Sequence, residues 1–156
     1  MRITKYTTKL AEDGKAVLEK EVSVNRPDLD KFMNSPEKIA AFATGYLRMH
    51  EFTEEHLYMI CLNNKLVMTS VFELSHGNVS SSIFSVREMF QKALLANAVN
   101  VILLHNHPSG DPSPSREDVD VTKKAVEAGK LIGVQVLDHL VIGRPMYSSL
   151  KEKGYI

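Results

Sequence analysis

Three side chains in the second half of the sequence have the types and spacing to bind a metal ion. His105 and His107 follow an apolar run at residues 101–104, and Asp118 comes eleven residues after His107. Residues i and i+2 of a strand point to the same face, so both imidazoles can face one cation. Two histidines, a carboxylate and a free position for water form the ligand set of a catalytic zinc site. We therefore predict Zn²⁺ bound by His105, His107 and Asp118.

The segment between the histidines and Asp118 is rigid and leads into a predicted helix. Pro108, Pro112 and Pro114 stiffen it, so it can return the carboxylate to the imidazoles without the metal to order it. Ser115 and Asp118 also fit the N-cap and third position of a helix, which is all that a helix start requires. The positive end of that helix favours an ionised Asp118, as a metal ligand needs. The two histidines, the rigid loop and the Ser115–Asp118 pair together exceed what helix capping requires, and they favour a metal site.

A hydrolase also needs an oxyanion stabiliser and a general base. The oxygen of Ser115 can accept a hydrogen bond from the helix start while its proton stays available for an oxyanion. A glutamate from elsewhere must take the proton of the attacking water. Glu55 precedes a predicted buried strand, and Glu54 and Glu73 are the other candidates; the residues alone leave this choice open. Asn106 is expected on the opposite strand face, where its amide can hold the loop by hydrogen bonds.

The composition is that of an ordinary globular domain. A chain of 156 residues, 44% hydrophobic and 24% charged, predicts one domain with a real core. The 19 basic residues balance the 19 acidic ones, so we expect no direct nucleic-acid binding through charge. The single cysteine, Cys61, excludes an intramolecular disulfide and a cysteine-rich zinc site. With neither an apolar signal segment nor a membrane-spanning stretch, we expect a cytoplasmic protein without membrane contact.

The elements that must position the candidate site alternate between strands and helices. Helix caps are expected at Ser35 and Ser85, a turn at Asp13-Gly14 and a helix stop at Gly129. In order, we expect a hairpin (2–24), a helix (35–50), antiparallel strands (57–62, 66–74), a loop (75–82), a helix (85–97), a strand (99–104), a helix (115–128), a strand (134–143) and a short surface helix (148–154).

This order predicts a single α/β domain around a mixed sheet. We divide the chain into an N-terminal hairpin extension, residues 1–34, and the domain proper, residues 35–156. The hairpin carries no residues of evident chemistry, and it is expected to cover the core or a partner. Its free edge would allow a homo-oligomer to form.

The candidate ligands also carry a family resemblance. The pattern His105-x-His107-Pro108, six residues, then Ser115-x-x-Asp118 resembles the JAMM motif of the JAB/MPN metalloprotease superfamily. Together with the string Leu-Asp-His-Leu-Val-Ile-Gly at residues 137–143, it specifically resembles the bacterial RadC family. The resemblance covers about residues 36–154. Because the family usually has a helical N-terminal region, and we predict only a short hairpin and a helix in the N-terminal part of this chain, we expect this chain to be a short form.

The resemblance implies a cytidine-deaminase-like α/β/α sandwich with zinc on the three ligands predicted above. It assigns Ser115 to the oxyanion and favours Glu55 as the base, because the catalytic glutamate of the superfamily precedes the corresponding strand. Asp138 and His139 match the family string without a metal role, and we expect them to be core polar residues or to support the ligands.

From these observations we predict a zinc-dependent hydrolase, of metallopeptidase or isopeptidase type, in which metal-bound water attacks an amide carbonyl. The partner would be a peptide or isopeptide substrate. A non-catalytic metal-bearing binding module and a DNA-repair-associated accessory protein are the alternatives, the latter resting on the label attached to the family. A zinc nucleoside deaminase is disfavoured because its His-x-Glu and Pro-Cys-x-x-Cys elements are missing.

Overall fold

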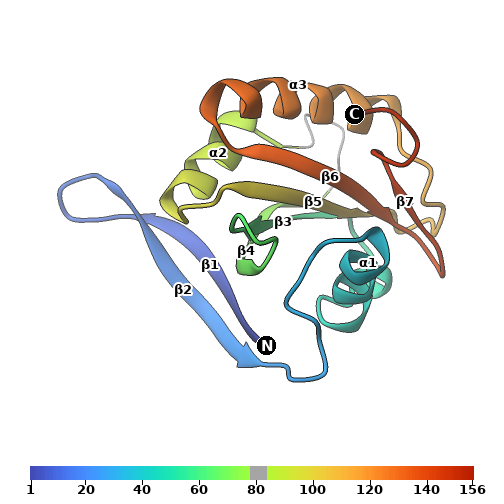
Figure 1. Ribbon diagram of the computed structural model, residues 1–156, viewed down its shortest axis with the longest axis horizontal. Coiled ribbons are helices and arrows are strands. Elements are labelled where there is room, and N and C mark those ends of the chain that lie inside the picture. Colours follow the sequence, from blue (N-terminus) through green and yellow to red (C-terminus); the bar gives the residue numbers. More distant parts are fainter. Residues whose placement is uncertain (78–83) are drawn as a thin grey trace.

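The computed structural model of the protein describes residues 1–77 and 84–156. The described strands form one mixed sheet in the order β2-β1-β4-β3-β5-β6-β7 (Figure 1). The strands are β1 (Arg2–Leu10), β2 (Ala16–Asn25), β3 (His56–Leu62), β4 (Met68–His76), β5 (Asn100–Asn106), β6 (Gln135–Ile142) and β7 (Tyr147–Ser149).

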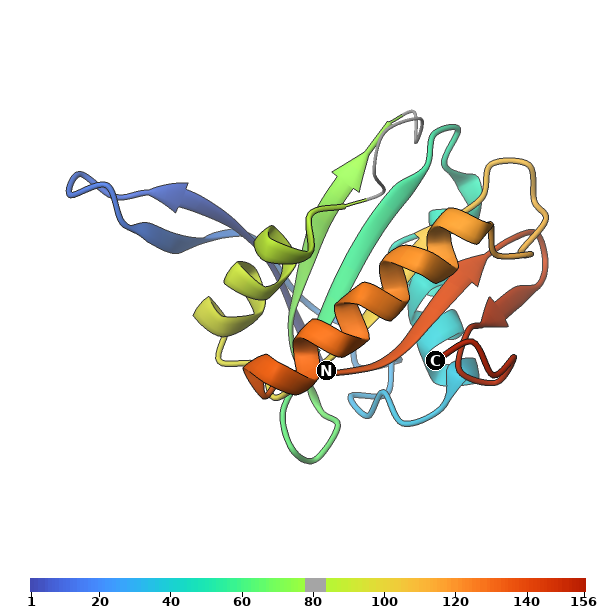
Figure 2. The same cartoon turned by 90° about the horizontal axis from the view of Figure 1, so that it is seen from above.

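Helices cover both faces of this sheet. α1 (Pro36–Gly45) and the short 3₁₀ helix η1 (Met49–Glu51) lie on one face, and α2 (Val86–Leu95) and α3 (Arg116–Ile132) lie on the other (Figures 1 and 2). This α/β/α arrangement confirms the predicted fold class. Among the residues described, no helix is long and apolar enough to cross a membrane.

The central strands are almost continuously apolar because they are buried on both sides. Alternate residues of β5 enter different cores, with Ile102 and Leu104 in the cluster beneath α1. Val101 and Leu103 join the cluster beneath α2 and α3. The face of β5 that carries Leu103 therefore also carries His105 at the end of the strand.

The pairing of the central strands brings two distant segments together. β5 runs antiparallel to β3 and parallel to β6, and His105 pairs with both Leu57 and Val141. Because β3 and β5 run in opposite directions, the last residues of β5 lie beside the first residues of β3. The residues just before β3, including Glu55, are thus placed next to the two histidines.

The N-terminal hairpin belongs to the same sheet but makes limited contact with it. β1 and β2 pair antiparallel around the predicted turn, and β1 joins β4 in parallel at the pair Lys5–Val71. Both views show the tip of the hairpin projecting away from the rest of the sheet (Figures 1 and 2). β2 is an edge strand, and an oligomer formed through it stays a prediction.

Glycine 129 does not stop the helix that follows the histidines. α3 continues through Gly129 to Ile132 and ends at Gly133, whose φ of 83° suits a residue without a side chain. A Cβ on Gly129 would lie 2.4 Å from the carbonyl oxygen of Val134. Gly129 is therefore needed for close packing between α3 and the chain that leads into β6.

The predicted first helix is too long. α1 ends at Gly45, where the N–H of Tyr46 still donates to the carbonyl of Phe42. Arg48 then adopts a left-handed conformation with φ of 55°, which ends any regular helix before η1 begins.

The predicted surface helix at residues 148–154 is wrong. Ser148 and Ser149 belong to β7, and Leu150 is fully buried. The buried carboxylate of Asp138 accepts hydrogen bonds from the Ser149 hydroxyl, at 2.6 Å, and from the N–H of Lys151. These bonds attach the C-terminal segment to β6, and its two serines, Ser148 and Ser149, are buried rather than solvated.

The loop predicted before the second helix begins later than expected. β4 includes residues 75 and 76, which pair with the start of β3. Residues 78–82 of the predicted loop lie outside the described part of the chain.

Candidate metal centre

The two histidines of the motif stand at the end of β5 with their rings in contact. The ring centroids of His105 and His107 are 4.6 Å apart and the planes are nearly perpendicular. His105 is buried, and its Nδ1 has no hydrogen-bond partner among the described residues. His107 is partly buried, and its Nδ1 lies 2.8 Å from the carbonyl oxygen of Asp111, which fixes the ring orientation. One imidazole nitrogen of this pair is therefore buried without a partner.

Asp118 serves the helix start and faces the histidines at the same time. The N–H of Ser115 donates to Asp118 Oδ2 at 2.7 Å, and the N–H of Asp118 donates to Ser115 Oγ at 3.1 Å. Oδ1 lies 3.6 Å from His105 Nδ1, and Oδ2 lies 3.6 Å from His107 Nε2. Separations of this length are too long for hydrogen bonds but leave room for a shared cation. The capping box expected of a simple helix start is present without accounting for the two histidines.

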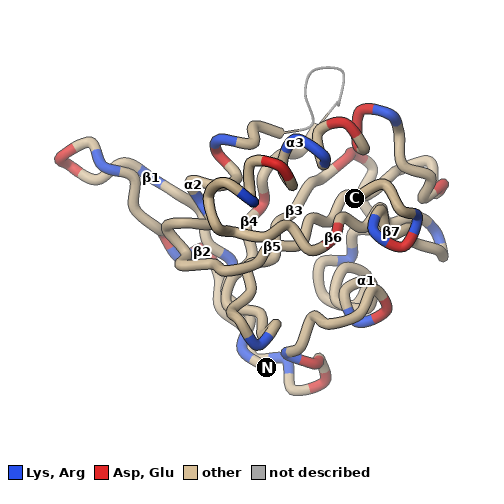
Figure 3. Tube along the Cα trace, turned by 45° about the horizontal axis from the view of Figure 1, so that its top comes forward, with Lys and Arg blue, Asp and Glu red and all other residues tan. Residues whose placement is uncertain are grey.

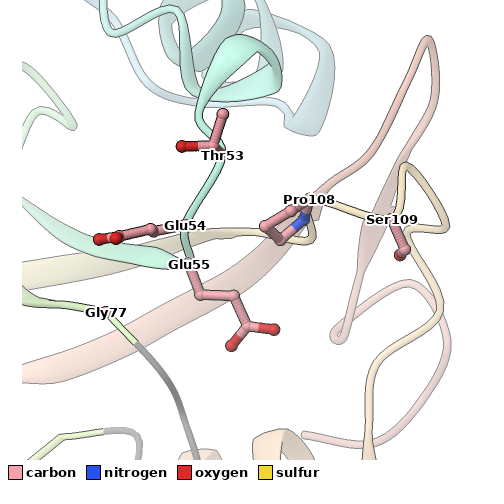
Figure 4. A pocket seen from close by; sticks show the side chains of 6 residues that line it. All are labelled: Thr53, Glu54, Glu55, Gly77, Pro108 and Ser109. Atoms are coloured by element: carbon pink, nitrogen blue, oxygen red, sulfur yellow. The ribbon is translucent and has the colours of Figure 1, made fainter.

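Glu55 reaches the same histidines from the start of β3. One carboxylate oxygen of Glu55 and one ring nitrogen from each of His105 and His107 lie within 4.8 Å of one another. The Glu55 side chain points into a cavity of about 450 Å³ (Figure 4). The cavity is lined by Thr53, Glu54, Glu55, Gly77, Pro108 and Ser109.

The other two candidate bases are placed differently. Glu73 accepts hydrogen bonds from Lys5 Nζ at 2.9 Å and contacts His56 Nδ1 at 2.8 Å, so its carboxylate is already occupied. Glu54 lines the cavity, but its side chain extends in a different direction from that of Glu55 (Figure 4). Of the three glutamates, the structure brings Glu55 to the histidines.

Burial and charge shift the pKa values of the site in different directions. Burial lowers the pKa of His105 to about 4, so this imidazole is neutral near pH 7. The nearby carboxylate of Asp118 raises the pKa of His107. Burial alone would raise the pKa of Asp118, but His107, His105 and Ser115 together lower it. Burial raises the pKa of Glu55. A neutral imidazole and an ionised carboxylate are the forms that a metal binds.

Behind His105 lies a polar group that the sequence only partly indicated. His139 is fully buried, and its ring centroid is 5.6 Å from that of His105. Its Nδ1 lies 2.7 Å from Thr122 Oγ1, which donates to the carbonyl oxygen of Asp118 at 2.5 Å. Thr122 was not among the predicted site residues, although it lies one helical turn after Asp118, a spacing that places both on one face.

Comparison with known sequences identifies the family of the chain. The sequence model of the RadC-like JAB domain matches residues 33–155. The chain belongs to the RadC-like JAB domain family. The matched region contains both histidines, Asp118 and Glu55, whose placement in the JAB domain is described above.

Three curated relatives of this JAB domain are each named as a UPF0758 protein. One from Clostridium acetobutylicum is 44% identical over 124 residues, which is 80% of this chain and 53% of the relative. One from Methanosarcina barkeri is 41% identical over 133 residues, 82% of this chain and 58% of the relative. One from Methanococcoides burtonii is 49% identical over 111 residues, 71% and 48% of the two chains. The chain spans about half the length of these relatives.

Proposed function

We propose that this JAB domain is a zinc-dependent hydrolase that cleaves an amide bond, of metallopeptidase or isopeptidase type. The observation that carries the proposal is the unpartnered, buried Nδ1 of His105, which lies 3.6 Å from a carboxylate oxygen of Asp118. A buried nitrogen without a partner costs free energy, and a cation between these two atoms would remove that cost. Neutral imidazoles with one carboxylate suit Zn²⁺.

His105, His107 and Asp118 would hold the metal. We prefer Asp118 to Glu55 as the third ligand because Asp118 is buried and faces both imidazoles. Glu55 instead extends into the open cavity (Figure 4). When bound, Zn²⁺ would polarise the substrate carbonyl and lower the pKa of water.

Glu55 is the general base of this proposal. Its partly buried carboxylate stands beside the histidines and faces the cavity in which a substrate would lie. The raised pKa of Glu55 brings the carboxylate closer to the range in which it can accept and return a proton near neutral pH. The proton of the attacking water would pass to Glu55 and then to the leaving nitrogen as the C–N bond breaks.

Ser115 would stabilise the oxyanion. Its oxygen accepts from the N–H of Asp118, so the hydroxyl proton is free to donate. Ser115 is exposed at the first residue of the capping box, where a substrate can approach. A donor placed where negative charge develops favours the transition state over the ground state.

The substrate we propose is a peptide or an isopeptide. Acidic and basic residues are interspersed over the surface, with both signs on the hairpin tip and on α3 (Figure 3). This mixed surface gives no support for direct nucleic-acid binding, which requires a concentration of positive charge. A cytoplasmic location stays an expectation.

The first test is the metal content of the purified protein by mass spectrometry. We expect close to one zinc ion per chain, lost in His107→Ala and Asp118→Ala and retained in the control His76→Ala, whose side chain is 67% exposed. Protein that contains no zinc and takes up none when it is added would contradict the proposal. Zinc-loaded protein that cleaves no peptide or isopeptide would instead indicate a binding module.

A further inference from the structure

We propose that Asn106 is a positioning residue that fixes Glu55 relative to the two histidines. The inference rests on the proposed function, because it takes Glu55 as the base. Asn106 lies between His105 and His107 and is 1% exposed. Its amide does not hold the proline-rich loop, as the sequence suggested, but the segment before β3.

Both ends of the Asn106 amide bind the backbone around Glu55. Oδ1 accepts a hydrogen bond from the N–H of His56 at 2.8 Å, and Nδ2 donates to the carbonyl oxygen of Glu54 at 3.0 Å. These two groups belong to the peptide units on either side of the Glu55 Cα. Because each peptide unit is planar, holding both units restricts the two backbone dihedrals of Glu55.

A side chain is needed here because the regular pairing stops one residue earlier. The β3–β5 register ends at the pair Leu57–His105. Asn106 extends the connection between the two strands past that pair and across Glu55. On the other side, the N–H of Gly77 donates to the carbonyl oxygen of Glu55 at 3.0 Å. The backbone of Glu55 is therefore held from both neighbouring strands.

Asn106 is itself firmly anchored. It pairs with Ile142 of β6, and the N–H of His107 donates to the Ile142 carbonyl oxygen at 3.0 Å. The residue after Glu55 is also held by its side chain, since the His56 ring lies 4.3 Å from that of Phe52. The position of the Glu55 carboxylate is then set mainly by its own side-chain torsions.

The two hydrogen bonds also explain why this residue is asparagine. An amide offers a donor and an acceptor, and both are used. Aspartate would accept from His56 but could not donate to Glu54, and it would bury another negative charge near Glu55. Serine is too short to reach both groups. His105 and His107 flank Asn106 in the sequence. Asn106 thus links the proposed base, Glu55, to the two histidine ligands.

The first test is amide hydrogen exchange of the zinc-free protein. In Asn106→Ala we expect the His56 amide to exchange about tenfold faster, relative to the Ile60 amide in the same strand, as the loss of one hydrogen bond implies. Asn100→Ala is the matched control, because Asn100 is also buried and donates to the carbonyl of Asn63 at the other end of β5. Unchanged exchange at His56 would overturn the inference. Asn106→Ser serves the same measurements if the alanine variant does not fold.

The second test is kinetic and uses a peptide or isopeptide that the wild-type protein cleaves. We expect Asn106→Ala to lower kcat by about 10- to 100-fold at unchanged KM and zinc content, as misplacement of a catalytic group does. When Asn106→Ala is combined with Glu55→Gln, kcat should fall no further than in Glu55→Gln alone. Equal falls in both backgrounds would show a merely structural role. If the wild-type protein cleaves nothing, the proposed function fails, and amide exchange alone decides whether Asn106 holds Glu55.

Discussion

Asp118 Oδ1 lies 3.6 Å from His105 Nδ1, between two side chains that are each 2% exposed. The other carboxylate oxygen of Asp118 is explained by the helix start, because it accepts from the N–H of Ser115. Oδ1 and Nδ1 are too far apart for a hydrogen bond with each other. The helix cap therefore accounts for the position of Oδ2, and a bound cation would account for the position of Oδ1 opposite His105.

Replacing Asp118 by asparagine separates these two roles. In Asp118→Asn the side-chain oxygen can still accept from Ser115, so the helix start should persist, but the charge is gone. We expect the zinc affinity to fall by more than the roughly 100-fold seen when residues supporting a ligand are removed. Competition with a chelator measures this. Asp120→Asn is the control, since Asp120 is 58% exposed in the same helix and pairs only with Arg116 among the described residues. Unchanged affinity in Asp118→Asn would contradict the ligand role.

The glutamates at the start of β3 allow a direct comparison of neighbours. Glu55→Gln should lower hydrolysis by about 10²- to 10⁴-fold, the contribution of a general base, with zinc content unchanged. Glu54→Gln should retain most of the activity, because Glu54 lines the same cavity but its side chain extends in another direction. Initial rates with one substrate decide between them. The opposite pattern would make Glu54 the base.

The sequence predicted what depends on local spacing. The hairpin turn at Asp13-Gly14, the caps at Ser35 and Ser85 and the buried β3 and β5 all follow from short-range patterns. The ligand candidates could be identified for the same reason, since two histidines on one strand face and a carboxylate on the next helix start need little knowledge of the fold.

What depends on long-range contacts could not be predicted. The choice among the glutamates rests on the β3–β5 register and on Lys5, which binds Glu73 from 68 residues away. A glycine at position 129 is typical of a helix end. Only the close approach of the Val134 carbonyl oxygen to Gly129 shows that this glycine is needed for packing. Ser149 lies in a strand because β7 pairs with β6, where the carboxylate of Asp138 also accepts a hydrogen bond from the Ser149 hydroxyl.

The two serine caps test the role of Ser115 in the reaction. Ser115 Oγ accepts from Asp118 N–H at 3.1 Å, and Ser85 Oγ accepts from Glu88 N–H at 3.3 Å. Alanine at either position should lower the free energy of unfolding by about 1 kcal/mol, the usual cost of a lost cap. Only Ser115→Ala should also lower kcat, by about 10²- to 10³-fold, as the loss of an oxyanion donor does. Urea unfolding and rate measurements on both variants check this, and equal activity in the two would remove Ser115 from the mechanism.

The metal-free protein should lose stability as the pH falls below about 6.5. Burial lowers the pKa of His105 to about 4 and also lowers that of His139, whereas an unfolded histidine keeps a value near 6.5. As the pH falls, the unfolded chain therefore protonates these histidines before the folded protein does. Their contribution to the free energy of unfolding is full above pH 6.5 and declines toward pH 4. At about pH 5.5 the loss should be roughly 1 to 1.5 kcal/mol for each buried histidine. The raised pKa of His107 acts in the opposite sense and reduces the net loss.

Urea unfolding of chelator-treated protein at about pH 7.5 and about pH 5.5 measures this dependence, since exposed carboxylates stay ionised over that range. His139→Gln should be less stable at the higher pH, because it loses a packed ring, but it should lose less stability on acidification. His76→Gln is the control, because His76 is 67% exposed and should leave the dependence unchanged. If His139→Gln loses as much stability as the wild-type protein between the two pH values, then His139 does not take up a proton on unfolding, and it must be protonated already in the folded core.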